Sequence, residues 1–349
     1  MHAEKMKRLA TISLLGVLVA CASSPASTSG PRPEAQHQRQ SPPPGESAAP
    51  PYRIVDATGP YLDFVESLPS LRPEERGAAF RAQVIGANPK LFAPSVIGLD
   101  PTKGEDALDA RLAAYLPTLP SRAATMQKVA REIRTTLGEH DATFRRAFPD
   151  MKWRGTVYFT ASIDAFDGAL REVRTGEGKT ELALLFGIDK IVTIYGADVR
   201  IGPLFHHELF HCYHVDQNPS IVSTGESHGM LEPLWSEGLA VYVASRLNPG
   251  TTNRELTLTD EMISAADARL GAIAAELRSQ LDDTSELTYR DFFLGAGKRQ
   301  DLPKRVGYYI GFRVARIVAE RHGGNLPELA RLARPQLRTE VDEALASLR

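Results

Sequence analysis

The chain has little cysteine, no excess of positive charge and no long apolar run after its first twenty residues. Its 41 Lys and Arg residues are matched by 43 Asp and Glu residues, so nucleic-acid binding has no electrostatic support. The two cysteines are Cys21 and Cys212, and if Cys21 is modified, no intrachain disulfide can form. Nothing after residue 20 is apolar over the length that a membrane-spanning helix needs.

The first twenty residues have the pattern of a secretory signal peptide. Three basic residues precede an apolar run over 9–20, which is too short for a permanent transmembrane helix. The run ends in LVAC at 18–21, which resembles the lipobox of bacterial lipoproteins. The resemblance implies cleavage before Cys21 and attachment of lipid, such as palmitate, to its thiol. Ala22 in the next position resembles the pattern exported to the outer membrane. The alternative is an ordinary signal peptide cleaved near Ala20 or Ala22.

We therefore expect a protein of the bacterial cell envelope, anchored by lipid to the outer membrane and facing the periplasm. Residues 21–51 are rich in Ser, Pro, Gly and Gln, and they have too little apolar surface to offset the entropy of ordering. They predict a disordered tether. After it, 52–150 predicts a helical amino-terminal lobe, because Leu and Ala recur at helical spacing over 74–84, 105–115 and 123–137.

The most informative motif of the chain is H-E-x-x-H, formed by His207, Glu208 and His211. On a helix, residues four apart lie on one face, so two imidazoles can bind one cation while the glutamate faces a water molecule beside it. Pro203 and the apolar neighbours of the motif favour a buried helix. A catalytic zinc site normally has three protein ligands and one open position, which predicts an acidic ligand downstream.

Glu237 meets this requirement, in the apolar helical stretch LWSEGLAVY. Gly238 and Ala240 would let this helix approach the motif helix closely. Glu232 is the competing ligand, but it precedes Pro233 and so lies at a helix entrance, where an acid more often complements the helix dipole. We therefore favour Glu237.

H-E-x-x-H followed by W-x-E-G-x-A resembles the gluzincin group of zinc metallopeptidases. The order of strand pair, motif helix, glutamate helix and a late G-Y-Y-x-G segment is similar to an uncharacterised bacterial family of predicted Zn-dependent proteases, over about residues 151–324. The resemblance implies a hydrolase with Zn²⁺ as cofactor, held by His207, His211 and Glu237. Glu208 would be the general base. No acid stands three or four residues after Glu237, so some other partner must orient the histidines.

Such a reaction needs a proton acceptor and a donor for the oxyanion. Zinc would acidify a water molecule, and Glu208 would accept its proton and return it to the leaving amine. Tyr308 and Tyr309 are the candidate oxyanion donors, because a phenol can donate a hydrogen bond to the developing charge. We slightly favour Tyr309. The alternative is that one or both tyrosines pack in a helix interface.

Other histidine, cysteine and acidic residues near the motif could bind a metal or a proton, but most of them are interpreted as structural or solvated. His206 points about 100 degrees away from its motif neighbour on a helix and is interpreted as structural. His214, further along the same helix, is a candidate partner for a zinc ligand. Cys212 is interpreted as a small buried side chain, and Glu226 and His228 as solvated loop residues.

The runs 153–162 and 188–195 are rich in β-branched and aromatic residues and predict strands. An exposed strand edge can bind an extended peptide by strand addition. In the proteases that this chain resembles, such a strand lies above the metal, which implies that Gly196-Ala197 marks where it leaves the cleft. Further on, 258–281 and 306–322 predict long amphipathic helices, the second ended by two glycines.

The predicted fold class is therefore α+β and mostly helical, with a small mixed sheet beside the motif helix. Residues 151–349 are expected to form a zincin-like metallopeptidase domain. The predicted function is that of a membrane-anchored zinc metallopeptidase with a peptide or protein substrate. The alternatives are hydrolysis of another amide, such as a cell-wall crosslink, and a non-catalytic lipoprotein that retains the fold. The intact Glu208 argues against the last of these.

Overall fold

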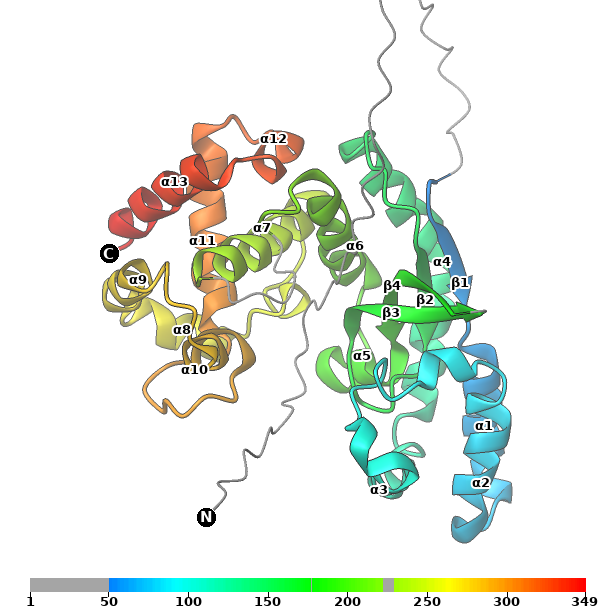
Figure 1. The fold of residues 1–349 in the computed structure, drawn as a ribbon. Coiled ribbons are helices and arrows are strands. Elements are labelled where there is room, and N and C mark those ends of the chain that lie inside the picture. The colour runs from blue at the N-terminus through cyan, green and yellow to red at the C-terminus, as the bar shows by residue number, and fades with distance from the viewer. Residues whose placement is uncertain (1–49, 177, 222–228) are drawn as a thin grey trace, which may run out of the picture.

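A computed structural model describes residues 50–176, 178–221 and 229–349 (Figure 1). The predicted signal peptide, Cys21 and nearly all of the predicted tether lie outside the described residues, and so do Glu226 and His228. Within the described ranges no helix is both long enough and apolar enough to cross a bilayer.

A four-stranded mixed sheet has the strand order β1-β2-β4-β3. The strands are β1 Arg53–Asp56, β2 Thr156–Thr160, β3 Gly168–Gly176 and β4 Lys179–Gly187. β1 pairs with β2, and β2 with β4, in parallel, whereas β3 pairs with β4 antiparallel. β2 is buried along its whole length because it is an inner strand. β3 lies at an edge, with strand partners on one side only.

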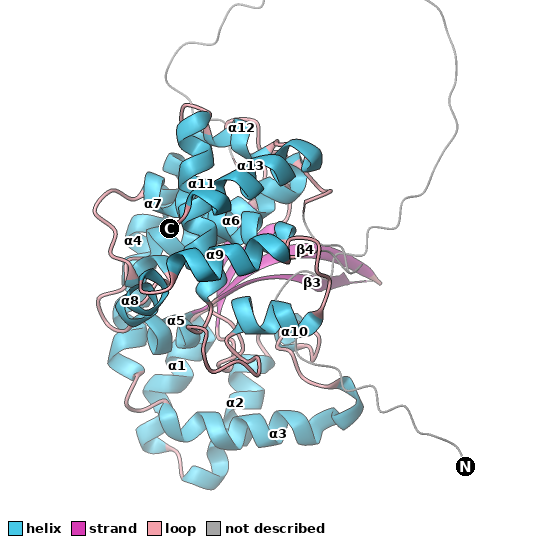
Figure 2. Ribbon diagram, turned by 90° about the vertical axis from the view of Figure 1, so that its left-hand side faces the viewer, coloured by secondary structure: helices cyan, strands magenta, loops and turns pink. Residues whose placement is uncertain are grey.

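Helices make up most of the fold, and the predicted α+β class is confirmed. Figures 1 and 2 show α1–α3 and α12–α13 at opposite ends of the molecule, and Figure 1 shows α6 between the sheet and α7. The helices are α1 Gly59–Ser67, α2 Arg76–Phe80, α3 Gly104–Tyr115, α4 Ala123–Ala147, α5 Ile188–Tyr195, α6 Ile201–Gln217, α7 Leu231–Leu247, α8 Asp260–Asp267, α9 Leu270–Ser279, α10 Glu286–Tyr289, α11 Val306–Arg321, α12 Leu326–Ala330 and α13 Arg334–Ser347.

The amino-terminal segment contains the predicted helices and one strand that the sequence analysis missed. α3 and α4 contain the segments predicted at 105–115 and 123–137, whereas 74–84 is divided among a 3-10 turn at Pro73–Glu75, α2 and a π-helical turn at Arg81–Ile85. The missed strand is β1, which continues the sheet by pairing with β2. It has four residues only, too few for an alternating pattern to be distinguished from a loop.

The prediction of a strand at 188–195 is wrong, because this segment is helix α5. Its buried apolar residues Ile188, Ile191, Val192 and Tyr195 stand at helical spacing, and this period outweighs the β-propensity of the side chains. The strand precedes it as β4, and Gly196 ends the helix with φ 81°. The expectation that Gly196-Ala197 ends an edge strand is therefore also wrong.

The predicted single helix over 258–281 is two helices, α8 and α9. The break follows Asp267, whose carboxylate accepts a hydrogen bond of 2.6 Å from Tyr309. Beyond it, the guanidinium of Arg269 bonds to the backbone oxygen of Asp301. Both partners are distant in sequence, so the break depends on tertiary contacts. By contrast, α11 is confirmed almost residue for residue, and Gly323 ends it at φ 62°.

Gly238 allows a close helix approach, but to α11 and not, as predicted, to the motif helix. A Cβ atom at Gly238 would lie 2.2 Å from the backbone carbon of Gly311, and one at Gly311 would lie 2.5 Å from the carbonyl oxygen of Leu234. The two glycines therefore let α7 and α11 cross backbone to backbone. This crossing brings the start of α11 to the site described next.

Candidate metal centre

Helix α6 carries the H-E-x-x-H motif and is buried on nearly every side. Almost all its residues from Ile201 to His214 are buried, because it lies against α4, α7 and the sheet (Figure 1). Glu132 of α4 accepts a hydrogen bond of 3.3 Å from the backbone N–H of Ile201. This satisfies one of the donors that a helix start leaves without a partner.

Three candidate ligand atoms converge between α6 and α7. His207 Nε2 lies 3.2 Å from His211 Nε2, and Glu237 Oε2 lies 3.3 Å from the first and 3.5 Å from the second. All three side chains are buried. The structure therefore brings together the two histidines and the glutamate that the sequence analysis singled out.

The triangle of donor atoms has the dimensions of a zinc site. Bonds of about 2.0–2.1 Å at tetrahedral angles place neighbouring ligand atoms about 3.3 Å apart. The observed separations of 3.2, 3.3 and 3.5 Å agree with this value. The second carboxylate oxygen of Glu237 is buried without a hydrogen-bond partner among the described residues. Two imidazoles and one carboxylate also match the nitrogen and oxygen ligands that zinc takes in catalytic sites, so the residues fit the ion.

The charges at the site favour a bound cation. Burial by itself would raise the pKa of Glu237, but the charges of His211 and His207 and their hydrogen bonds hold it well below its usual range. Burial likewise opposes protonation of His211, yet the neighbouring Glu237 carboxylate raises its pKa. The carboxylate thus stays ionised in a buried place as long as it has a positive partner, and a bound cation would take that part when the two histidines are neutral, as metal ligands must be.

Glu208 lies beside the triangle, against the edge strand. A Cβ atom at Gly168 of β3 would lie 2.5 Å from Cδ and 2.6 Å from Oε1 of Glu208, so only glycine leaves room for this carboxylate. Burial raises the pKa of Glu208 above its ordinary value. Glu208 and the three candidate ligands line one cavity of about 330 Å³, together with residues 165–171 at and before the start of β3.

Tyr308, rather than Tyr309, faces this cavity. Its ring lies 6.5 Å from that of His207, between centroids, and burial raises its pKa well above the ordinary value, which keeps the phenol a hydrogen-bond donor. Tyr309 does not line the cavity; its hydroxyl donates to Asp267 at 2.6 Å and accepts from Arg313 at 2.7 Å. Only one of the two candidate donors therefore reaches the cavity, and it is Tyr308 and not the Tyr309 that we had slightly favoured, because neighbouring residues on a helix point about 100 degrees apart.

Residues 185–337 match the family described as Predicted Zn-dependent protease (DUF2268). The matched region covers somewhat less than half of the 349-residue chain. It contains the three candidate ligands, Glu208 and Tyr308, and it supports the assignment to a zinc-dependent protease family. The match begins after Gly168, so it excludes β3. No curated protein and no solved structure matches the chain.

Ser236 is the partner for His211 that the sequence analysis left open. Its hydroxyl oxygen lies 3.4 Å from His211 Nδ1, and it is the neighbour of Glu237 on α7. When Nε2 faces the ligand triangle, Nδ1 carries the proton and can donate to this oxygen, which fixes the ring. A serine next to an acid gives no distinctive sequence signal.

The remaining histidines of α6 lie outside the ligand triangle. His206 donates from Nε2 to the backbone oxygen of His140 at 2.9 Å and accepts from Asn248 at 2.8 Å, as its structural interpretation requires. His214 is fully buried against Phe210, with centroids 5.3 Å apart. It does not line the cavity.

Glu232, the competing acid, and Cys212, the free cysteine, have contacts that suit a structural role. Glu232 lies in the first turn of α7, where its carboxylate accepts a hydrogen bond of 2.7 Å from Arg334. It is not part of the ligand triangle. Cys212 is buried, and burial raises the pKa of its thiol well above the ordinary value.

Several cavity residues were missed by the sequence analysis. Gly168 has no local signal, because its role depends on a carboxylate forty positions later. The others carry positive charge and come from separate elements: Arg171 from β3, Lys190 from α5 and Arg305 from the N-cap of α11. Isolated basic residues are common on protein surfaces, so only the fold could assign these to the cavity.

Proposed function

We propose that this chain is a zinc-dependent peptidase that hydrolyses peptide bonds at the site between α6 and α7. The observation that carries the proposal is the buried triangle of His207, His211 and Glu237 with Glu208 beside it in one cavity. The family match over residues 185–337 supports the same class of reaction. The donor set, the spacing and the adjacent carboxylate are those of zinc hydrolases.

Glu208 and Tyr308 would each have a defined role in this hydrolysis. Zinc, when bound, supplies a Lewis acid that polarises the scissile carbonyl and acidifies water. Glu208 accepts the proton of the attacking water on its carboxylate and delivers it to the leaving nitrogen. Its raised pKa suits a group that must hold a proton between these steps. Tyr308 donates a hydrogen bond to the carbonyl oxygen as negative charge develops there.

We propose β3 as the strand that binds the substrate. Among the residues that the structure describes, no strand pairs with its outer edge, and residues 165–171 form one wall of the cavity. An extended peptide can pair with such an edge through main-chain hydrogen bonds. Gly168 would set the scissile bond beside Glu208, because the strand and the carboxylate are in contact there.

We also propose that lipid on Cys21 holds the enzyme at the outer membrane, facing the periplasm. The support comes from the sequence alone: a basic segment, a short apolar run and LVAC at 18–21. More than one acyl chain would make the attachment stable.

Metal content and hydrolysis of casein test the peptidase proposal. The soluble form that begins after Cys21 is expected to contain about one zinc per chain by elemental analysis. His211→Ala and Glu237→Ala should lose the metal. Glu208→Gln should keep it and lose hydrolysis by about a hundredfold or more.

Glu232→Gln is the matched control, and it should retain zinc because Glu232 bonds to Arg334 instead. Full zinc content in Glu237→Ala would contradict the ligand assignment. Absence of bound metal from every form would contradict the proposal as a whole. Activity on purified sacculi with none on casein would instead identify a cell-wall amide as the substrate.

A further inference from the structure

Three cationic side chains line the cavity of the candidate metal centre. They are Arg171, Lys190 and Arg305, each partly buried. None forms an ion pair with any residue that the structure describes, although ion pairs join many other basic residues of the described chain. Partly buried cations without a carboxylate partner are costly unless something else compensates them.

Arg171 is on the edge strand, three residues after Gly168. Its guanidinium donates a hydrogen bond of 2.8 Å from Nη1 to the backbone oxygen of Leu170 and lies 5.8 Å from the centre of the Phe166 ring. Burial lowers the pKa of its guanidinium, while the charge of Glu208 opposes this effect. The group is therefore desolvated, lies within reach of the field of the proposed general base, and has unused donors.

Arg305 reaches the cavity from the N-cap of α11. Its guanidinium lies over the ring of Tyr308, 4.3 Å from the centroid. Its backbone has φ 60° and ψ 25°, a left-handed conformation that is unfavourable for an L-residue other than glycine. The fold thus holds a cation beside the proposed oxyanion donor by means of a strained backbone.

The charges of the cavity do not cancel when a divalent cation is present. Three carboxylates line it, those of Asp167, Glu208 and Glu237. A bound zinc ion would balance two of these negative charges. Three cationic side chains then face one acid, Asp167, which already accepts a hydrogen bond of 2.9 Å from Tyr195. The cavity therefore carries an excess of positive charge available to a ligand.

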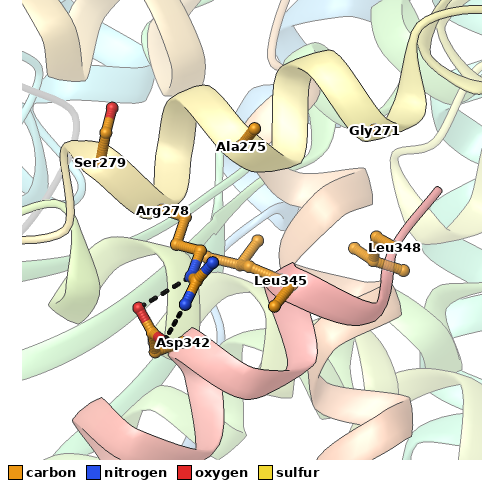
Figure 3. A pocket seen from close by; sticks show the side chains of 8 residues that line it. Gly271, Ala275, Arg278, Ser279, Asp342, Leu345 and Leu348 are labelled. Carbon is orange, nitrogen blue, oxygen red and sulfur yellow. Dashed lines mark hydrogen bonds and ion pairs between the residues drawn. The ribbon is translucent and has the colours of Figure 1, made fainter.

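The groove between α9 and α13 shows the contrasting case (Figure 3). Its arginine, Arg278, is held by Asp342 through two hydrogen bonds of 3.0 and 2.7 Å, so its charge is neutralised within the protein. Small residues such as Gly271 and Ala275 form its floor. This groove offers no unpaired charge to a ligand, whereas the cavity of the metal centre does.

We infer that Arg171 and Arg305 bind a carboxylate of the substrate, so that the enzyme acts on peptides with an acidic group next to the scissile bond. This inference rests on the proposed peptidase function. Guanidinium groups suit the task because they bind carboxylates through two parallel hydrogen bonds. The carboxylate is either an Asp or Glu side chain or the carboxyl terminus of the peptide, and the experiment separates these two sources.

Binding is measured with zinc-loaded Glu208→Gln protein, which should not cleave its ligand. The probes are four short fluorescein-labelled peptides that carry Glu or Gln at one position and end in a free acid or an amide. Fluorescence anisotropy should give about tenfold tighter binding of the preferred carboxylate form, decreasing with added salt. A Glu-over-Gln preference indicates a side chain, and an acid-over-amide preference indicates the carboxyl terminus.

Arg171→Met and Arg305→Met, in the same background, should each abolish most of this preference, while Arg171→Lys should retain part of it. Arg131→Met is the matched control, because Arg131 is an exposed residue of α4 that lies outside both the cavity and the proposed substrate strand. Thermal unfolding verifies that every variant is folded. Equal affinity for all four peptides, or a preference that survives both Met variants, would overturn the inference.

Cleavage of a mixed peptide library by the wild-type enzyme separates this inference from the proposed function. Cleavage without preference for acidic positions would overturn the inference and leave the peptidase proposal standing. Carboxylate-dependent binding with no cleavage of any peptide would overturn the peptidase proposal and leave carboxylate binding by the two arginines standing. If the protein neither cleaves a peptide nor prefers a carboxylate, both proposals are overturned.

Discussion

At the scale of single residues, the site depends on one absent side chain as much as on those that carry chemistry. Gly168 allows the Glu208 carboxylate to lie against β3, because any Cβ there would be within 2.5 Å of its Cγ and Cδ. The backbone of Gly168 is not in the left-handed region, so space and not conformation requires glycine. The edge strand and the general base are thereby placed in contact.

Gly168→Ala is expected to leave the protein folded and zinc-loaded but to displace the Glu208 side chain. Misplacing a catalytic group by about 1 Å can cost about a hundredfold in rate, so kcat/KM should decrease by roughly this factor. Steady-state hydrolysis with zinc analysis measures both properties. Gly77→Ala is the control, because a Cβ there has nothing within 4 Å. Unchanged hydrolysis by Gly168→Ala would show that Glu208 does not need its present position.

At the scale of elements, the crossing of α7 and α11 holds the two walls of the site together. α7 supplies Glu237 and α11 supplies Tyr308, and the helices touch at Gly238 and Gly311. Because the contacts of a Cβ at Gly238 would be with backbone atoms, no side-chain movement can relieve them. The position of the carboxylate relative to the phenol is therefore fixed by two glycines.

Gly238→Ala should destabilise the protein by about 1–3 kcal/mol, the usual cost of overpacking a buried contact, and should weaken zinc binding because Glu237 is the adjacent residue. Gly138→Ala in α4 is the opposite case. A Cβ there has nothing within 4 Å, so the higher helix propensity of alanine should stabilise by up to about 1 kcal/mol. Chemical denaturation measures both. A stabilising Gly238→Ala would contradict the close crossing.

Within individual elements, the spacing of apolar residues and the β-propensity of the side chains did not always predict the same secondary structure. α11 could be predicted because its apolar spacing and the glycines that end it agree. α5 could not be predicted from its many β-branched residues, since its apolar residues repeat with a helical period. The break between α8 and α9 lies next to the contact of Asp267 with Tyr309, and no local pattern contains that contact.

At the scale of the whole molecule, the proposed enzyme is a catalytic domain on a lipid-anchored tether. The candidate metal centre lies between α6 and α7, and Figure 1 shows α6 on the side of the sheet and α7 on the side of the carboxyl-terminal helices. A tether rich in proline would hold this domain tens of ångströms from the bilayer. The substrates would then be peptides that reach the periplasmic space near the membrane.

Cys21→Ala should remove lipid from the full-length protein and move it from the membrane to the soluble fraction of a diderm bacterial host. Metabolic labelling with a palmitate analogue, followed by fractionation, measures both effects. Cys212→Ala is the control, and it should remain labelled and membrane-bound because Cys212 is buried within α6. Label that persists in Cys21→Ala would exclude this cysteine as the attachment site.

The sequence by itself determined the chemistry that is close in the chain. His207 and His211 stand four residues apart, and a helix places such residues on one face wherever it is packed, with Glu208 beside that face. Glu237 could be added because a zinc site needs a third ligand and an acid in an apolar helix needs a partner. The helical content and the α+β class likewise followed from local periodicity.

Tertiary structure alone decided which distant groups share the cavity. The choice of Tyr308 over Tyr309 depends on the rotation of α11, which its crossing with α7 sets. Gly168, Arg171 and Arg305 enter the site because β3 and the start of α11 both line the cavity beside α6, and no spacing within the sequence encodes that arrangement. Short-range geometry is fixed by covalent structure and helix periodicity, whereas contacts between elements depend on the packing of the whole core.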